Sequence, residues 1–358
     1  MKHIVRAGLF LGAVVALSAC GDPRIATCEE TDGVNLICGL TNPEDMALLP
    51  DGQHVIFGEF GGMLGEHGGA ITIANVKTNA VTRLFPIAGG VPAKAEGWGD
   101  DACPGPPLAA AFAAHGIDLG FRADGALALL VVNHGGREAV EFFEVSQGAN
   151  PTVTWRGCAV APAGKNLNDV VWHPDGEAFY TTNMMELSEG GSQMMGNMKA
   201  ALGMDTGEVL RWDAVSGYSP VPGTAGPMPN GIEIAPDGSA LYINTYGAGE
   251  IRKVSLTDGA LLGSYPVTGP DNVTWSLDGR LLVAGHPDAL AVLPCLNATG
   301  GHCPAAYEIH AISSDLREGE VINAGEGAPF GAATVALDVG NELWLGTFSG
   351  DRIARVKK

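Results

Sequence analysis

The chain has 358 residues and a formal net charge of −20, with 40 acidic side chains against 20 Lys and Arg. This length accommodates one large domain with a substantial core, or two smaller domains. Because such a surface repels phosphate backbones and no Lys/Arg cluster occurs, we expect no nucleic acid partner.

The N-terminal segment has the pattern of an export signal. Lys2 and Arg6 precede an apolar run over residues 7–19, which is shorter than the roughly 20 residues that a membrane-spanning helix needs. The run closes in Leu17-Ser18-Ala19-Cys20, which resembles a bacterial lipobox and so implies removal of residues 1–19 and lipidation of Cys20. The alternative is an ordinary signal peptide with a chance cysteine.

The lipobox implies an exported lipoprotein of the bacterial cell envelope, in contact with the membrane through its anchor only. Gly21 after Cys20 resembles lipoproteins that pass to the outer membrane and face the periplasm, while Asp22 leaves the inner membrane open. We expect residues 20–40 to form an N-terminal tether.

Six further cysteines, an even number, suit an oxidising compartment and predict disulfides. They occupy positions 28, 38, 103, 158, 295 and 303. Cys28 with Cys38 and Cys295 with Cys303 are close enough to close small loops, and Cys103 with Cys158 would then form a longer link. Other pairings of six cysteines stay open.

A turn centred on Asp recurs six times and is followed each time by apolar sequence rich in β-formers, as in hairpins. The turns are Asp51-Gly52, Asp124-Gly125, Asp175-Gly176, Asp237-Gly238, Asp278-Gly279, and Asp338 with Gly340. One hairpin per blade predicts an all-β, six-bladed β-propeller over residues 41–358. A two-sheet sandwich gives the same local signals, but recurring units over this length favour radial repetition.

The position seven residues before each turn Asp suggests a metal site. It holds, in order, Glu44, Ile117, Asn168, Asn230, Asp271 and Gly331. Equivalent positions on inner strands converge on the axis of a propeller, so two carboxylates and two carboxamides would meet in a central channel. A hard cation that takes 6–8 oxygens, calcium before magnesium, would satisfy them. Turn capping is the alternative for any single residue.

The next position holds Asp45, Asp118, Asp169 and Asn272, which offer a fifth ligand or a second site. At these residues the chain resembles the paraoxonase/arylesterase family and, more distantly, gluconolactonase-like and strictosidine-synthase-like propellers. The motifs that carry the resemblance are Pro43-Glu44-Asp45, Ala114-His115-Gly116-Ile117, Val132-Asn133-His134, Asn166-Leu167-Asn168-Asp169, Asn230-Gly231-Ile232, Asp271-Asn272-Val273 and Gly285-His286-Pro287.

The resemblance implies two calcium ions, one catalytic and one structural. For the catalytic ion it implies the ligands Glu44, Asn168, Asn230, Asp271 and Asn272. For the structural ion it implies Asp45, Asp169 and the backbone carbonyl of Ile117. It also implies a histidine dyad, His115 and His134, at the channel mouth, with His115 as the general base.

Two further residues are expected to line a substrate pocket. His286 lies in a family motif, with a purely structural role as its alternative, and Met184 belongs to a Met-rich segment over residues 183–210 that could accept apolar groups. Packing of this segment against the propeller edge is the alternative. Met184 and Met185 replace the Asp and His of the family, and the C-terminus lacks the family's closing cysteine, so ring closure must depend on strand pairing.

The sequence is compatible with two functions. The first is a calcium-dependent hydrolase of lactones and possibly esters, in which calcium polarises the carbonyl and the histidine dyad activates water. The second is a non-catalytic envelope propeller that binds a ligand or protein and holds calcium only for structure.

Overall fold

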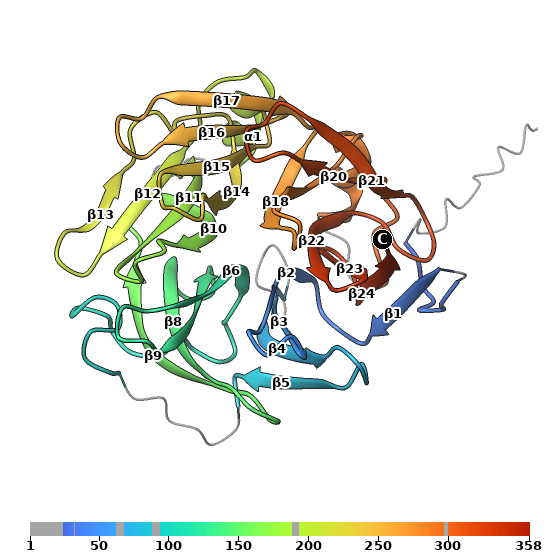
Figure 1. The fold of residues 1–358 in the computed structure, drawn as a ribbon, viewed down its shortest axis with the longest axis horizontal. Helices are drawn as coiled ribbons and strands as arrows, with labels where there is room; N and C mark the ends of the chain where they lie inside the picture. The colour runs from blue at the N-terminus through green and yellow to red at the C-terminus, as the bar shows by residue number, and fades with distance from the viewer. Residues whose placement is uncertain (1–23, 32, 62–67, 88–93, 188–192, 297–299) are drawn as a thin grey trace, which may run out of the picture.

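The strands form six four-stranded sheets arranged in a ring, as predicted for a six-bladed propeller (Figure 1). The structure is a computed structural model that describes residues 24–31, 33–61, 68–87, 94–187, 193–296 and 300–358. The helical elements in this part are α1 (Gln193–Ala201), α2 (Ala289–Val292) and the 3-10 turn η1 (Leu293–Cys295). None of the described helices is long and apolar enough to cross a membrane.

Each of the first five blades is a meander of consecutive strands. Blade 1 contains β2 (Pro43–Leu48), β3 (His54–Glu59), β4 (Ala70–Asn75) and β5 (Val81–Phe85). Blade 2 contains β6 (Ala114–Phe121), β7 (Leu127–Asn133), β8 (Ala139–Ser146) and β9 (Thr152–Val160). Blade 3 contains β10 (Lys165–Trp172), β11 (Ala178–Glu186), β12 (Glu208–Asp213) and β13 (Gly217–Pro220).

Blades 4 and 5 follow the same plan, and blade 6 takes its fourth strand from the N-terminal segment. Blade 4 contains β14 (Pro229–Ile234), β15 (Ala240–Thr245), β16 (Glu250–Ser255) and β17 (Leu261–Pro266). Blade 5 contains β18 (Pro270–Trp275), β19 (Leu281–Gly285), β20 (Tyr307–Ile312) and β21 (Gly319–Gly325). Blade 6 contains β22 (Ala333–Val339), β23 (Glu342–Thr347), β24 (Arg352–Lys357) and β1 (Val34–Cys38).

The first strands of the blades, β2, β6, β10, β14, β18 and β22, contact one another in turn and surround the axis of the ring (Figure 1). Antiparallel pairing within each four-strand blade returns the chain to the end from which it started, so all six inner strands begin at the same end. We call this end of the ring the upper face and the opposite end the lower face.

The Asp-Gly turns after the first five inner strands form as predicted. In the first turn the carboxylate of Asp51 accepts a hydrogen bond from the backbone N–H of Gln53 at 2.7 Å, and Gly52 has a φ of 63°. This Asx-turn geometry, with glycine at the left-handed position, explains why the dipeptide recurs. The turns after β6, β10 and β14 repeat the bond at 3.0, 2.9 and 3.0 Å.

The sixth predicted turn is wrong. Asp338 lies inside β22, and the chain reverses at Gly340 and Asn341. The Asp338 carboxylate instead accepts hydrogen bonds from the backbone N–H of Leu277 at 3.0 Å and from the Lys358 ammonium. It therefore joins blade 6 to blade 5 rather than forming a turn.

The ring closes through strand pairing between the two ends of the chain, as expected. β1 pairs antiparallel with β24, with Val34 opposite Val356 and Cys38 opposite Arg352. The predicted tether of residues 20–40 is therefore wrong in its second half, because Val34–Cys38 is the outer strand of blade 6. The start of the predicted tether lies outside the described residues.

Three disulfides link the six cysteines. They join Cys28 to Cys38, Cys103 to Cys158, and Cys295 to Cys303. The first ties the segment before β1 to the end of that strand, and the second ties the insertion before β6 to β9. These are the pairings that sequence proximity favoured.

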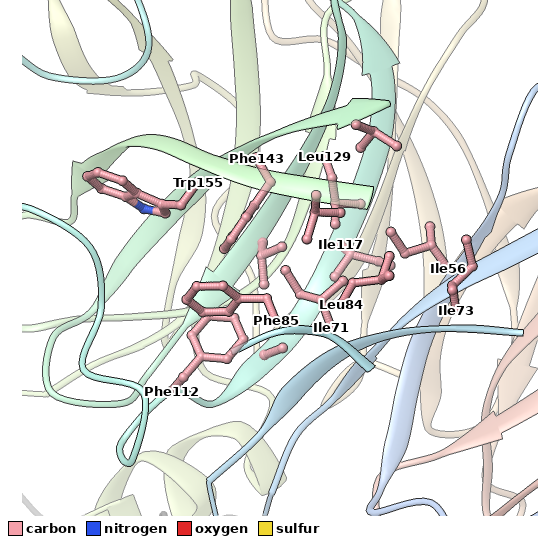
Figure 2. Packing of buried hydrophobic residues seen from close by; sticks show 14 of the residues in the cluster. Ile56, Ile71, Ile73, Leu84, Phe85, Phe112, Ile117, Leu129, Phe143 and Trp155 are labelled. Carbon is pink, nitrogen blue, oxygen red and sulfur yellow. The ribbon is translucent and has the colours of Figure 1, made fainter. Parts of the chain in front are cut away.

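Apolar side chains fill the spaces between neighbouring blades. Figure 2 shows the cluster between blades 1 and 2, where Phe85 lies edge-on to Phe112 and Phe143 with both ring centroids at 4.9 Å. Similar clusters join the later pairs of blades and join blade 6 back to blade 1. In the cluster between blades 6 and 1, β1 contributes Ile37, so this strand helps to complete the last interface.

Truncation of Ile37 tests this closure. Ile37 in β1 is 4% exposed and packs in the cluster between blades 6 and 1. Because Ile37→Ala leaves a cavity there, we expect the free energy of unfolding to fall by about 2–5 kcal/mol in urea denaturation. The control Asn35→Ala, at an exposed position of the same strand, should change it by less than about 0.5 kcal/mol. Equal stability of the two variants would contradict the closure.

Candidate functional site

Every inner strand opens with a break in its pairing register. The breaks lie between Pro43 and Asp45, Ala114 and Ile117, Leu167 and Val170, Pro229 and Ile232, Pro270 and Val273, and Ala333 and Val335. Such bulges release residues from the ladder and redirect their side chains. The first released residue is polar in all six blades: Glu44, His115, Asn168, Asn230, Asp271 and Thr334. We call these six residues the upper ring.

The upper ring corrects two positions of the sequence count. In blade 2 the member is His115 and not Ile117, because Asp124 of the turn follows the released residue by nine positions, whereas Asp175 follows Asn168 by seven. In blade 6 the member is Thr334 and not Gly331, because the turn lies at Asn341, and seven residues back from Asn341 is Thr334. His115 therefore occupies the same position as the predicted metal ligands.

The predicted catalytic-calcium ligands are buried together at the upper end of the axis. Their exposed fractions are 2% for Glu44, 3% for Asn168, 5% for Asn230, 8% for Asp271 and 2% for Asn272. The Asn272 amide crosses from blade 5 and donates a hydrogen bond to Glu44 Oε1 at 2.8 Å. The structure thus brings ligand-type side chains of blades 1 and 5 into contact.

Three oxygens of this group are buried without a hydrogen-bond partner. They are Glu44 Oε2, Asn230 Oδ1 and Asn272 Oδ1. An unpaired buried oxygen is costly, whereas coordination to a hard cation would satisfy carboxylate and carboxamide oxygens together. The residues present therefore fit a calcium-type ion.

The shifted pKa values of the carboxylates in this group also favour a bound cation. Burial, and then the nearby Asp45 and Asp271 carboxylates, raise the pKa of Glu44 well above its ordinary value. Burial also raises the pKa of Asp271 to about 7. Among the described residues no three His, Cys, Asp or Glu side chains form a metal-binding group, so a cation here would need the asparagine oxygens as well. That requirement argues against zinc and for an oxygen-seeking ion.

The residues implied for the second ion lie close together but are already engaged. Asp45 Oδ2 accepts from the Ile117 N–H at 2.7 Å, and Asp169 Oδ2 accepts from the Ile232 N–H at 2.8 Å. The second oxygen of each carboxylate accepts from the next residue of its own strand, Met46 or Val170. The observed contact is thus with the amide of Ile117, whereas the resemblance implied its carbonyl as a ligand.

These carboxylates stitch neighbouring inner strands together. Asp45 joins blade 1 to blade 2, and Asp169 joins blade 3 to blade 4. Asp118 joins blade 2 to blade 3, because its Oδ2 accepts from the Trp172 N–H at 2.7 Å while Oδ1 accepts from the Leu119 N–H at 2.8 Å. These three carboxylates therefore have a structural role between blades that was not predicted from the sequence.

Close approach of the inner strands explains the glycines in two motifs. A Cβ on Gly116 would lie 2.5 Å from Asp169 Cα, and one on Gly231 would lie 2.5 Å from the Asp271 carbonyl oxygen. A side chain at either position would push apart the strands that carry the upper ring. The sequences His115-Gly116 and Asn230-Gly231 therefore each combine a ring residue with the glycine that lets the next strand approach.

The two predicted histidines form a hydrogen-bonded pair. His115 Nδ1 lies 2.8 Å from His134 Nε2, and His134 Nδ1 lies 2.9 Å from Glu138 Oε2. The other nitrogen of His115, Nε2, lies 3.8 Å from Glu44 Oε1. Burial, and then the neighbouring His134, lower the pKa of His115 well below its ordinary value. A neutral His115 thus stands between Glu44 and His134.

Sequence reasoning missed two residues that support this pair. Phe60 stacks on His115 with ring centroids 4.5 Å apart. The carboxylate of Glu138 accepts from His134 and also from the backbone N–H of Leu167 at 2.6 Å, so the start of β10 holds it in place. The spacing of four residues between His134 and Glu138 was the available signal.

His286 lies beside the upper ring. It is 1% exposed, its Nδ1 is 3.9 Å from Asp271 Oδ2 and 3.5 Å from the Tyr246 hydroxyl, and its Nε2 has no partner. Met184 is half-buried in β11, where its carbonyl accepts from the Thr206 hydroxyl at 2.9 Å. Lining of a substrate pocket by these two residues stays a prediction. Cys20, the predicted lipidation site, lies outside the described residues.

A surface cavity of about 390 Å³ lies elsewhere. Its lining includes Pro236, Asp237 and Gly279 in the turns that follow two inner strands, together with Tyr242 and Trp275. These turns are at the lower face between blades 4 and 5, whereas the unpaired oxygens and the histidine pair are at the upper face. We therefore place the candidate site at the upper ring.

Comparison with known proteins gives one family. A family model described as the SMP-30/Gluconolactonase/LRE-like region matches residues 119–326. Among solved structures, a gluconolactonase from Xanthomonas campestris is 15% identical, with a TM-score of 0.51 over 94% of each chain. A luciferin-regenerating enzyme is 13% identical, with a TM-score of 0.53 over 91% of this chain and 95% of its own. No curated protein sequence matches.

The stitching role of Asp118 can be tested by Asp118→Asn. The carboxamide has a single oxygen and cannot accept from both the Trp172 and Leu119 N–H groups, so we expect a loss of about 1–3 kcal/mol in unfolding free energy. The measurement is made above the pKa of about 6 to which burial raises this carboxyl. Asp124→Asn, in the exposed turn after the same strand, is the matched control, and an equal loss in both would refute the stitch.

Proposed function

This chain belongs to the SMP-30/gluconolactonase/LRE-like family, whose model matches more than half of it, and from that premise we propose that it is a calcium-dependent lactonase. The observation that carries the proposal is the set of unpaired buried oxygens on Glu44, Asn230 and Asn272 beside a hydrogen-bonded histidine pair. Ester hydrolysis, with the same carbonyl chemistry, is a second reaction that this site would support.

The proposed ion site uses Glu44, Asn168, Asn230, Asp271 and Asn272. A bound calcium ion would supply an electrophile for the carbonyl oxygen of the substrate. The oxygen set matches that role because it combines two carboxylates with three carboxamides, all at least nine-tenths buried. Asp45, Asp169 and Ile117 remain a proposed second, structural site, in competition with their role as stitches between blades.

The hydrogen bonds define a proton pathway through this chain's own residues. The Glu138 carboxylate accepts from His134 Nδ1–H, which leaves the lone pair on His134 Nε2. His115 Nδ1–H donates to that lone pair, so the free lone pair of His115 is on Nε2, toward Glu44 and the upper ring. Glu138 therefore sets both tautomers, and this assignment follows from the network.

The proposed reaction places a water molecule at His115 Nε2. As the water oxygen bonds to the lactone carbonyl carbon, His115 Nε2 takes its proton, and the Nδ1 proton can shift to His134 with Glu138 as counter-ion. When the ring C–O bond breaks, His115 Nε2 returns a proton to the departing oxygen. The product is one hydroxy acid with an alcohol end and a carboxylic acid end, and the acid end then releases its proton to solvent. Phe60, stacked on His115, restrains the ring for both transfers.

We also propose that the chain is exported and lipidated at Cys20 in the bacterial cell envelope, with the outer membrane favoured by Gly21. The three disulfides support an oxidising compartment. They link residues of blade 6, of blade 2 with the insertion before it, and of the insertion in blade 5, so the fold itself would benefit from export.

Removal of the cation should abolish turnover. We expect EDTA to eliminate hydrolysis of short γ- and δ-lactones and of phenyl acetate, and added calcium to restore it, because the electrophile is lost and regained. The readout is the initial rate by pH indicator, together with the melting temperature. Calcium-dependent melting without turnover on any substrate would instead favour a non-catalytic binding propeller.

Replacement of the base should remove activity without unfolding the protein. For His115→Gln we expect kcat to fall by about 10²- to 10⁴-fold with the melting temperature and calcium affinity little changed, because Nε2 no longer takes a proton. His173→Gln, a half-buried histidine of the lower face paired with Asp175, is the matched control and should keep full activity. Retention of lactone hydrolysis by His115→Gln would contradict the assigned base.

A further inference from the structure

Exposed apolar side chains gather on the upper face. Among the described residues, the large exposed hydrophobics in upper connections are Ile87, Leu108, Met195, Met198, Leu202, Met204, Leu290 and Leu293. They belong to three insertions: the segment between β5 and β6, α1 with its following turn between β11 and β12, and α2 with η1 between β19 and β20. Together these insertions surround the axis on several sides.

The lower face differs. Its turns carry fewer such residues in the described chain, namely Val81, Phe121, Val215, Leu261 and Leu277. Each lies in or next to a tight turn of a different blade and not in an insertion. Scattered single hydrophobics of this kind are ordinary on soluble surfaces, whereas several gathered on the same insertions of one face mark an interaction surface.

The first described residues are also fixed to the upper face. Ile25 pairs with His302 in the insertion between β19 and β20. Arg24 donates to the Gly301 carbonyl at 2.9 Å, and the fully buried Arg352 donates to the Thr27 carbonyl at 2.6 Å. Arg352 begins β24 at the upper end, so the chain enters the fold from this side.

The chain between Cys20 and Arg24 is short. Four residues reach at most about 14 Å when fully extended. A lipid attached to Cys20 would therefore keep Arg24, and with it the insertion between β19 and β20, close to the headgroups of the membrane. That insertion carries Leu290 and Leu293, which are 75% and 53% exposed.

We propose that the upper face is a bilayer-docking surface, on which the apolar insertions contact the membrane that holds the acyl chains of Cys20. The proposal requires lipidation of Cys20 but does not depend on the lactonase activity. A bilayer suits the observations because it is flat and apolar, so it can meet three separated insertions at once, and because the anchor is attached to the same face. The proposed channel mouth would then open toward the membrane surface.

Tryptophan reporters on the two faces test the proposal. The protein is isolated from bacterial membranes, its acylation at Cys20 is checked by mass spectrometry, and it is reconstituted in phosphatidylcholine vesicles with brominated acyl chains. Leu290→Trp and Leu202→Trp report on two upper insertions, and Leu277→Trp, 69% exposed against 75% for Leu290, is the matched lower control. We expect bromine to quench the added emission of both upper reporters by at least about twofold more than that of the lower one.

The remaining outcomes would overturn the proposal. Equal quenching at both faces would show no preferred orientation, and preferential quenching of Leu277→Trp would show the opposite one. Absence of acyl chains on Cys20 would remove its premise. A change in the upper reporters that needs no vesicles and scales with protein concentration would assign the face to a second copy of the chain. Agreement between the two upper reporters guards against a local folding defect in either insertion.

Discussion

The structure depends on the convergence of buried oxygen-bearing side chains at the start of six inner strands. A register break at the same place in every blade turns Glu44, Asn168, Asn230 and Asp271 away from the sheet ladders. Burial alone would make this arrangement costly, as the raised pKa values of Glu44 and Asp271 indicate. A bound cation would convert the same convergence into a stabilising interaction, so the proposed site and the stability of the ring would have a common cause.

Polar residues at different depths along the axis have different roles. The upper ring and its neighbours Asn272 and His286 leave buried oxygens and one histidine nitrogen without partners, which is typical of groups reserved for a ligand. Asp45 and Asp169, one position further along their strands, and Asp118, three positions further, accept hydrogen bonds from backbone N–H groups of the following blade. These carboxylates hold the inner strands in register, and the register fixes where the upper ring residues point.

The sequence predicts much of this because the repeat is chemical as well as structural. Asp-Gly turns need a carboxylate acceptor and a left-handed glycine, so five of six could be located from residue type alone. The sixth could not, since Asp338 lies two residues before the turn at Gly340 and accepts a hydrogen bond from Leu277 of blade 5. The strand β1 was also hidden, because its partner β24 is at the other end of the chain. The role of Glu138 was not predictable for a similar reason, because it depends on β10, whose Leu167 N–H holds the carboxylate beside His134.

The central claim is that four residues of the upper ring, together with Asn272, bind a cation, and a crystal structure grown with calcium tests it most directly. We expect an anomalous density peak that lies about 2.3–2.6 Å, the range typical of calcium, from oxygens of Glu44, Asn168, Asn230, Asp271 and Asn272. The peak should vanish in crystals grown with EDTA. Side chains that keep their positions around ordered water, with no cation density at saturating calcium, would contradict the claim.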